Sequence, residues 1–296
     1  MEHTENTVVT PHELSPSGEA LSEGLAIRLE SCEINAWRDL YAAAPADFAQ
    51  AHGLGIERFQ TLVMTRCATI PFTHFNCVMN MGLMAPATQE QLDTVLARYR
   101  DNAIKSFTFY HVPFSKPREL PDWYVSRGFA LTGGWDRIYR DNRPIAPCAA
   151  CGVPTGADLG VETVTATTAR EWAAFIDTTY GLPTSPWLLA LVDRPGWHHY
   201  LLRQRRGCVA ARSMYMHHDG MVWFGIDAPV PGVMAPSFDW DAQLCQSMVR
   251  DALALGAQGF VADIEAPSQQ MDTMAYRHFA SLGFNRAYFR GHYRRG

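Results

Sequence analysis

The sequence predicts an α/β fold of the α+β kind, with two similar lobes in tandem, each a mixed and largely antiparallel sheet flanked by helices. Two observations lead to this expectation. Helical and strand-like segments alternate along most of the chain, and their order in the first half is repeated in the second. Both halves also finish in the same way, with a helix that runs into a Gly-Phe pair and a strand that contains Tyr and Arg.

In the first half, apolar residues define a helix with a clear start. Leu92, Val95, Leu96 and Tyr99 recur at helical spacing, and Thr88 is placed to cap the N-terminus of this helix. The expected elements are a strand, a helix, a strand, a helix and a strand over residues 75–83, 89–102, 105–112, 120–129 and 134–140.

The second half repeats this series with a longer helix. Leu244, Met248, Ala252 and Leu255 form an apolar stripe that we expect to face a sheet, and Gly256 follows as a C-cap. The expected strand, helix, strand, helix and strand cover residues 221–227, 241–255, 259–265, 274–284 and 287–295.

Composition divides the chain into four parts. Residues 1–24 are polar and lack apolar periodicity, so we expect a flexible tail. The N-terminal lobe then covers residues 25–140 and the C-terminal lobe residues 161–296. Between them, residues 141–160 contain three prolines and three glycines without a helical or strand period, which is typical of a linker.

Charge and composition exclude several functional classes. The net charge of the 296-residue chain is −5, so no basic field is available to bind nucleic acid or an anionic membrane surface. No apolar run reaches the roughly 20 residues of a membrane-spanning helix. The seven cysteines are scattered and the N-terminus lacks the pattern of a signal peptide. We therefore expect a cytoplasmic protein with free thiols and a small-molecule or protein partner.

Several segments of the second half together carry a resemblance to a known family. They are the segment PWLLALVDRPGWHHYL, the hairpin CVAARSMYMHHDGMVWFGID, the long helix ending in ALALGA, and AYRHFASLGFNRAYFRGHYRR. In this order and spacing they resemble the GNAT superfamily of N-acetyltransferases, and the whole chain resembles its tandem-GNAT members. The resemblance implies transfer of an acyl group from acetyl-CoA to an amine between splayed central strands.

The resemblance also implies where acetyl-CoA binds. The strand before the long helix would pair with the pantetheine arm, and the N-terminus of that helix would face the pyrophosphate, where amide groups and the helix dipole favour anions. The implied cofactor-binding residues are Phe224, Gly225, Ile226, Asp241, Ala242 and Gln243.

The expected pyrophosphate loop departs from the family pattern. Where the family alternates Arg and Gly, this chain has Phe238, Asp239, Trp240 and Asp241, and no Arg or Lys lies between Asp227 and Arg250. A carboxylate beside a pyrophosphate in a partly dry site can cost a few kcal/mol. The loop is therefore a degenerate one that argues against tight acetyl-CoA binding. Alternatively, Asp241 is simply the N-cap of the helix.

Candidate catalytic residues follow from the same resemblance. Many family members have a tyrosine acid at the position of Phe279, so Tyr276 and His278 nearby on the helix are the candidates for a proton carrier. Glu265 is the candidate base and Asp227 its counterpart on the neighbouring strand, because carboxylates at strand ends border ligand crevices. Alternatively, Tyr276 packs at the sheet edge, His278 is solvated, and both carboxylates cap turns.

The linker contains one further motif with chemical content. Cys148 and Cys151 have the spacing of a zinc or redox pair, but a zinc or iron site would require two more ligands. The other cysteines lie in expected helices and strands or at their ends, where small apolar thiols pack well. We therefore expect no metal at this pair.

Three functions are consistent with these observations. The first is a GNAT-like acyltransferase that moves an acyl group from acyl-CoA to an amine of a small molecule or protein. The second is a divergent enzyme that kept the scaffold and no longer uses acetyl-CoA. The third is a ligand- or metal-binding protein without catalytic activity. We favour the first because the resemblance predicts a substrate class.

Overall fold

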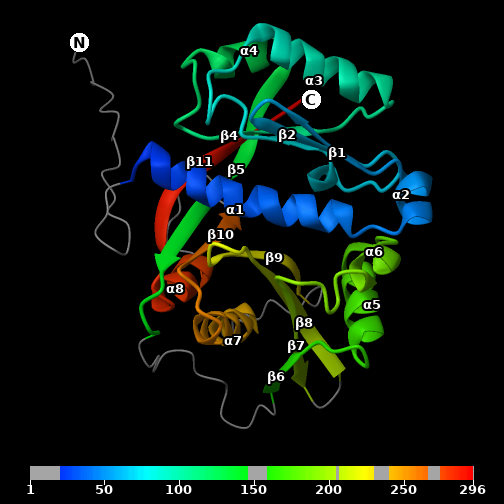
Figure 1. Ribbon diagram of the computed structural model, residues 1–296, viewed down its shortest axis with the longest axis vertical. Helices are drawn as coiled ribbons and strands as arrows, with labels where there is room; N and C mark the ends of the chain where they lie inside the picture. Colours follow the sequence, from blue (N-terminus) through cyan, green and yellow to red (C-terminus); the bar gives the residue numbers. More distant parts are fainter. Residues whose placement is uncertain (1–20, 146–158, 205–206, 230–239, 266–273, 296) are drawn as a thin grey trace, which may run out of the picture.

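The structure is a computed structural model that describes residues 21–145, 159–204, 207–229, 240–265 and 274–295 (Figure 1). Its helices are α1 (Glu23–Ala42), α2 (Ala46–His52), α3 (Gln89–Asp101), α4 (Leu120–Ser126), α5 (Ala169–Tyr180), α6 (Ser185–Leu189), α7 (Trp240–Ala254) and α8 (Met274–Ser281), with a 3-10 helix η1 (Thr73–Phe75). Its strands are β1 (Gly55–Phe59), β2 (Leu62–Arg66), β3 (Cys77–Met79), β4 (Thr108–His111), β5 (Phe129–Asp141), β6 (Leu159–Thr163), β7 (Trp197–Gln204), β8 (Gly207–Met216), β9 (Met221–Pro229), β10 (Gly259–Glu265) and β11 (Asn285–Arg295).

The described strands form one continuous sheet in the order β1-β2-β3-β4-β11-β5-β10-β9-β8-β7-β6. In this order, the last strand of each half lies beside strands of the other half, an arrangement we call the strand exchange. β11, from the second half, lies between β4 and β5 of the first, and β5 lies between β11 and β10 of the second. Both strands run through the middle of the molecule (Figure 1).

The pairing of the exchanged strands is extensive. β5 pairs antiparallel with β11 along 129–139 and with β10 along 135–141. A mixed, largely antiparallel sheet flanked by helices was predicted, and it is confirmed. The division into two lobes with a linker stays a prediction, and the topology shows that the two halves complete one sheet together.

Helix α1 lies across the middle of the molecule on one face of the sheet (Figure 1). Ser22 caps its N-terminus by accepting a hydrogen bond from the Leu25 backbone N–H at 3.1 Å. Its buried face, which includes Leu29, Trp37 and Leu40, packs in a core that also contains side chains from β2, β3, β7 and β9. α1 therefore packs against strands from both halves.

The other face of the sheet is covered by four helices. α3 and α4 pack on the strands of the first half, where Leu92, Val95 and Tyr99 are buried as the spacing predicts. Thr88 caps α3 in a capping box with Gln91. α7 and α8 pack on the strands of the second half. None of the helices in the described ranges is long and apolar enough to cross a membrane.

Two expectations about these elements were wrong. Leu255 was expected to face the sheet, but α7 ends at Ala254 and the side chain of Leu255 is 54% exposed. The strand expected over 75–83 is reduced to β3, because the chain forms η1 before it and a turn after it, where Asn80 has a left-handed φ of 61°.

Candidate active site

The central strands of the second half separate beside a bulge in β9. β9 and β10 are paired in parallel from Met221 and Gly259 to Trp223 and Val261, and in the described residues their pairing stops there. Further along β9, its register with β8 shifts, so that residues 226 and 227 both stand opposite Arg212. The bulge and the end of the pairing together open a gap between β9 and β10.

The local geometry of the bulge depends on two residues. Ile226 has a left-handed φ of 47°, and the backbone oxygen of Asp227 accepts a hydrogen bond from Tyr180 of α5 at 2.5 Å. A Cβ at Gly225 would lie 2.0 Å from Cη2 of the Trp223 ring. Only glycine at 225 therefore lets this ring lie against its own strand.

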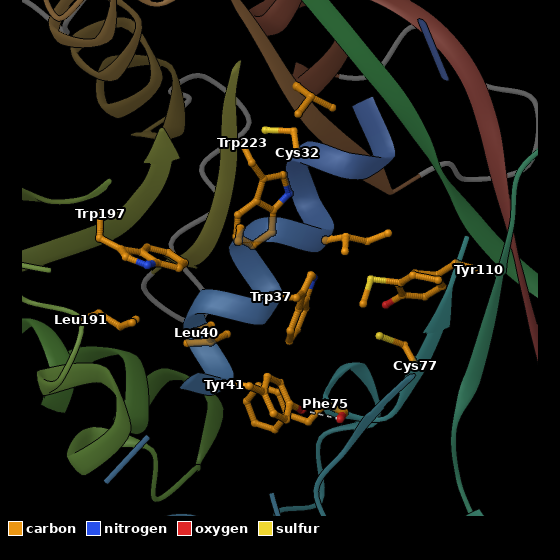
Figure 2. Close-up of a cluster of buried hydrophobic side chains, with 14 of the residues drawn as sticks. Cys32, Trp37, Leu40, Tyr41, Phe75, Cys77, Tyr110, Leu191, Trp197 and Trp223 are labelled. Atoms are coloured by element: carbon orange, nitrogen blue, oxygen red, sulfur yellow. Dashed lines mark hydrogen bonds between the residues drawn. The ribbon is translucent and has the colours of Figure 1, made fainter. Parts of the chain in front are cut away.

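A cavity of about 450 Å³ opens beside this gap, and both halves of the chain line it. Trp37 of α1 is central to its wall: its ring centroid is 6.3 Å from that of Trp223 and 6.5 Å from that of Phe75 (Figure 2). The aromatic side chains of the wall include Trp37, Phe72, Phe75, Trp135, Trp187 and Trp223. The cavity is therefore largely apolar and is composed of elements far apart in sequence.

Four carboxylates line the same cavity: Glu33, Asp227, Asp263 and Glu265. Arg212 of β8 also reaches it, and its guanidinium lies 5.9 Å and 5.7 Å from the ring centroids of Phe224 and Phe279. Acidic side chains therefore outnumber basic ones among the described lining residues.

His74 adds no positive charge at neutral pH. It donates to or accepts from the Tyr110 hydroxyl at 3.0 Å and stacks on Trp135 with a centroid separation of 4.8 Å. Burial, with Arg294 and Arg290 nearby, lowers the pKa of His74 to about 4.

Two of the lining carboxylates belong to a buried ion cluster formed by Glu30, Glu33, Arg137, Asp263 and Arg290. Arg137 donates to Glu30 Oε1 at 2.9 Å, to Glu33, and to Asp263 Oδ2 at 3.0 Å. Arg290 donates to Glu30 Oε2 at 3.2 Å, to Glu33, and to Asp263 Oδ2 at 3.2 Å. The cluster joins α1, β5, β10 and β11, and so joins both halves.

The pKa values of two carboxylates in the cluster, Glu33 and Asp263, are shifted in opposite directions. Arg290 and Arg137 offset the effect of burial at Glu33 and lower its pKa far below the usual value. Burial has the largest effect on the pKa of Asp263 and raises it, as do the negative charges of Glu33 and Glu30. The two guanidinium groups lower this pKa by less, so that it is raised to about 6. Asp263 therefore binds a proton at a higher pH than Glu33 does.

The structure brings some of the predicted site residues together. Phe224, Gly225, Ile226, Asp227 and Glu265 all line the cavity. Their roles in binding or catalysis stay predictions.

Three other predicted cofactor-binding residues lie at the start of α7. Ala242 is buried and Gln243 is partly buried in its first turn. The side chain of Asp241 and the residues 230–239, which hold the predicted degenerate loop, are outside the described residues. Cys148 and Cys151 also fall outside them. Among the residues that are described, no group of three or more His, Cys, Asp or Glu side chains is arranged to hold a metal ion.

Tyr276 and His278 lie on α8 rather than among the described lining residues of the cavity. The hydroxyl of Tyr276 donates a hydrogen bond to Asp136 Oδ2 of β5, and Arg286 pairs with the other carboxylate oxygen at 2.8 Å. His278 is buried, not solvated, and its ring stacks on Phe279 at 4.5 Å. Their proposed role as proton carriers stays a prediction.

Sequence reasoning missed Glu33, Trp37, Arg212 and Asp263. Glu33 and Trp37 stand four residues apart in α1, where the indole donates to Glu33 Oε1 at 3.1 Å. Acidic residues on the apolar face of a helix signal a buried partner, but the partner could not be identified from the sequence. Asp263 lies inside an apolar strand and carries the same kind of signal.

The fold agrees with solved structures at low sequence identity. The GCN5-related N-acetyltransferase from Kribbella flavida matches with a TM-score of 0.55 and 14% identity, over 92% of this chain and 95% of that one. The GCN5-related N-acetyltransferase from Sphaerobacter thermophilus matches with a TM-score of 0.56 and 13% identity, over 81% and 82%. The protein has the GNAT fold.

A third match is a functionally unknown conserved protein from Staphylococcus epidermidis, with a TM-score of 0.52 and 9% identity over 81% of this chain and 92% of that one. A scan of protein-family models and a search of curated proteins found no match. The predicted resemblance to the GNAT superfamily is confirmed as a fold. Identities this low leave the activity to be argued from the site.

Proposed function

We propose that this GNAT-fold protein transfers an acyl group from acyl-CoA to an amine bound in the cavity between its two halves. The observation that carries the proposal is the gap between β9 and β10, which opens onto a cavity lined by four carboxylates. A gap of this kind gives access from one side of the sheet to a pocket on the other. Acyl donor and amine could therefore meet at the end of the two strands.

The described part of the gap fits an acyl-CoA. Because β9 and β10 stop pairing at Trp223 and Val261, the β10-facing edge of residues 224–227 is available to the amides of a pantetheine arm. Bound there, acyl-CoA would supply an activated acyl group.

The chain's own residues would handle the amine and its proton. An amine is protonated at neutral pH and must lose a proton before its nitrogen can attack a carbonyl carbon. In this proposal Glu265 and Asp227, which line the cavity, accept that proton directly or through water. The aromatic wall would exclude bulk water and orient the amine.

One observation favours a second candidate function. Asp239 and Asp241 introduce negative charge where a pyrophosphate would need hydrogen-bond donors. A GNAT-fold protein that binds an amine in the same cavity but no longer uses acetyl-CoA would tolerate these residues. This candidate predicts amine binding without any binding of CoA thioesters.

Calorimetric titration of the purified chain with acetyl-CoA and with CoA separates the two candidates. Acyl transfer predicts a dissociation constant in the micromolar range for acetyl-CoA. The double variant Asp239→Gly/Asp241→Gly should bind more tightly, because it removes two like charges. If neither form binds acetyl-CoA at millimolar concentration, the acyltransferase proposal fails and the second candidate stands.

A further inference from the structure

We propose that the amine of this site is a compact monoamine with an aromatic or branched aliphatic body, held by residues of both halves of the chain. Its ammonium group would bind beside Glu33 and Asp263, and its body would lie against the aromatic wall. The inference deepens the proposed function and rests on it for the acyl transfer. The binding of the amine, however, does not depend on acyl-CoA.

When all of its carboxylates are ionised, the buried cluster has one more negative charge than it has positive charges. Glu30, Glu33 and Asp263 carry three negative charges when ionised, whereas Arg137 and Arg290 supply two positive ones. An uncompensated charge in a dry site is costly, and an ammonium ion a few Å away would balance it. Glu33 and Asp263 are the members of the cluster that line the cavity. A further cation in the cavity would therefore lie next to these two carboxylates.

Hydrogen bonding within the cluster is also incomplete at Asp263. Both guanidinium groups donate to Oδ2 of this carboxylate, at 3.0 Å and 3.2 Å. The other oxygen, Oδ1, is buried and accepts no hydrogen bond from the described residues. By contrast, both oxygens of Glu33 accept hydrogen bonds, from Arg137, Arg290 and Trp37. Asp263 is therefore the carboxylate with capacity for a further donor.

The aromatic side chains that line the cavity favour a particular kind of group attached to the ammonium of the ligand. Trp37 and Trp223 line the cavity together with the two carboxylates, which suits a cation because aromatic ring faces attract positive charge. Phe72 and Phe75 continue this surface in the first half, with ring centroids 4.9 Å apart. A volume of about 450 Å³ lies within the usual range for sites that enclose a small organic molecule.

The same lining disfavours other amines. The second ammonium of a diamine would lie against aromatic rings unless it reached Asp227 or Glu265, the carboxylates assigned here to accept the proton of the attacking amine. An α-amino acid would bring its own carboxylate close to Glu33 and Asp263, where like charges repel. Arg212 is the one residue among the described lining side chains that could offset that repulsion, so an amino acid is a specific alternative to be tested.

Quenching of tryptophan fluorescence can measure binding directly, because Trp37, Trp135, Trp187 and Trp223 line the cavity. The probes are 2-phenylethylamine, its neutral analogue 2-phenylethanol, 1,4-diaminobutane and L-phenylalanine, titrated into the full chain without acyl-CoA at pH 8. We expect 2-phenylethylamine to bind at least tenfold more tightly than each of the other three. Equal binding of the alcohol would overturn the role of the cluster, and tighter binding of L-phenylalanine would overturn the monoamine.

Variants test the named residues. Asp263→Asn keeps an acceptor for Arg137 and Arg290 and removes the charge, so 2-phenylethylamine should bind at least tenfold more weakly. Phe72→Ala, in the other half, should weaken it severalfold. Glu57→Gln of β1 is the matched control and should change nothing.

These outcomes separate the inference from the proposed function. If 2-phenylethylamine binds as expected but acetyl-CoA does not, the ligand class stands and the acyltransferase proposal fails. If acetyl-CoA binds and none of the amines does, the acyltransferase proposal stands and the inferred ligand class is wrong. Unchanged binding by Asp263→Asn, with its fold intact by circular dichroism, would likewise contradict the assignment.

Discussion

Arg137 and Asp263 are direct cross-strand partners, with 3.0 Å between Arg137 Nη1 and Asp263 Oδ2. Arg137 belongs to β5 of the first half and Asp263 to β10 of the second. The pair is therefore a product of the strand exchange, and it lies where the exchanged strands meet the cavity. Stability and ligand binding should depend on the same residues.

The variant Asp263→Asn should stabilise the protein at alkaline pH. The folded-state pKa of Asp263, about 6, exceeds its usual value of 3.8, so between these values the native state binds more protons than the unfolded state. The contribution of Asp263 to stability is therefore present below pH 4 and lost as the pH rises to about 6. This difference corresponds to about 3 kcal/mol.

Urea unfolding at several pH values measures this effect. The neutral Asp263→Asn variant should be more stable than the wild type by about 1–3 kcal/mol at pH 8, and the two should converge near pH 4. A loss of stability at pH 8 would show that Asp263 is retained for its ion pairs and not for ligand binding.

Removing one of the two positive charges from the ion cluster should strongly destabilise the protein. Arg137→Met leaves Glu30, Glu33 and Asp263 with a single guanidinium in a dry site, for an expected loss of about 3–5 kcal/mol. Arg100→Met is the control, because Arg100 and its partner Asp101 are exposed and 3.7 Å apart. Chemical denaturation that gave similar stabilities for both variants would contradict this assignment.

The strand exchange predicts that the halves are interdependent. A chain cut between residues 145 and 159 leaves β5 in one fragment and its neighbours β10 and β11 in the other. We expect each fragment alone to lack fixed tertiary structure, and a mixture refolded from urea to form one complex with the near-UV circular dichroism of the intact chain. If the two fragments each folded separately as monomers, the predicted interdependence of the halves would be wrong.

Gly225→Ala should damage the site itself. The new methyl group would meet the Trp223 ring at about 2.0 Å, so the ring must move into the cavity. Overpacking of this kind costs about 1–3 kcal/mol, and the displaced ring should weaken amine binding at least tenfold. Gly160→Ala is the control, because a Cβ there meets no atom within 4 Å. Fluorescence titration of both variants with 2-phenylethylamine measures the difference.

Amine binding should depend on pH through Asp263. This carboxylate is surrounded by Arg137 of β5, Arg290 of β11 and by Glu30 and Glu33 of α1, and its pKa is raised to about 6 by burial. Lowering the pH from 8 to 5 should protonate it and weaken the binding of 2-phenylethylamine about tenfold, since the ligand stays cationic throughout. The Asp263→Asn variant should lose this dependence. Wild-type affinity that is constant across this range would contradict it.

The fold class could be predicted because its signals are local. Apolar spacing predicted α3, and its Thr88 cap is present; the order of segments in the second half predicted β9, α7, β10, α8 and β11. The strand exchange could not be predicted in this way, because β5 and β11 have the same local pattern whichever strands they pair with. Register between distant strands is set by tertiary packing.

Only the part of the site that follows local sequence patterns could be predicted. Gly225 was predicted from the family resemblance, and Asp227 and Glu265 were predicted because they fall at strand ends in the second half; all three line the cavity, and their roles stay predictions. The wall and the carboxylate contributed by α1 were missed, since no local pattern shows that Glu33 and Trp37 lie beside β9 and β10. Arg212 was missed because a single arginine within a strand usually faces solvent.

Hydrogen–deuterium exchange with and without acetyl-CoA tests most directly whether acyl-CoA binds in the gap between β9 and β10. We expect bound acetyl-CoA to slow exchange in peptides covering residues 224–229 and 262–265, while peptides from β1 and β2 remain unchanged. Absence of protection at β9 and β10, under conditions where calorimetry detects binding, would place the ligand elsewhere and contradict the proposed acyltransferase site.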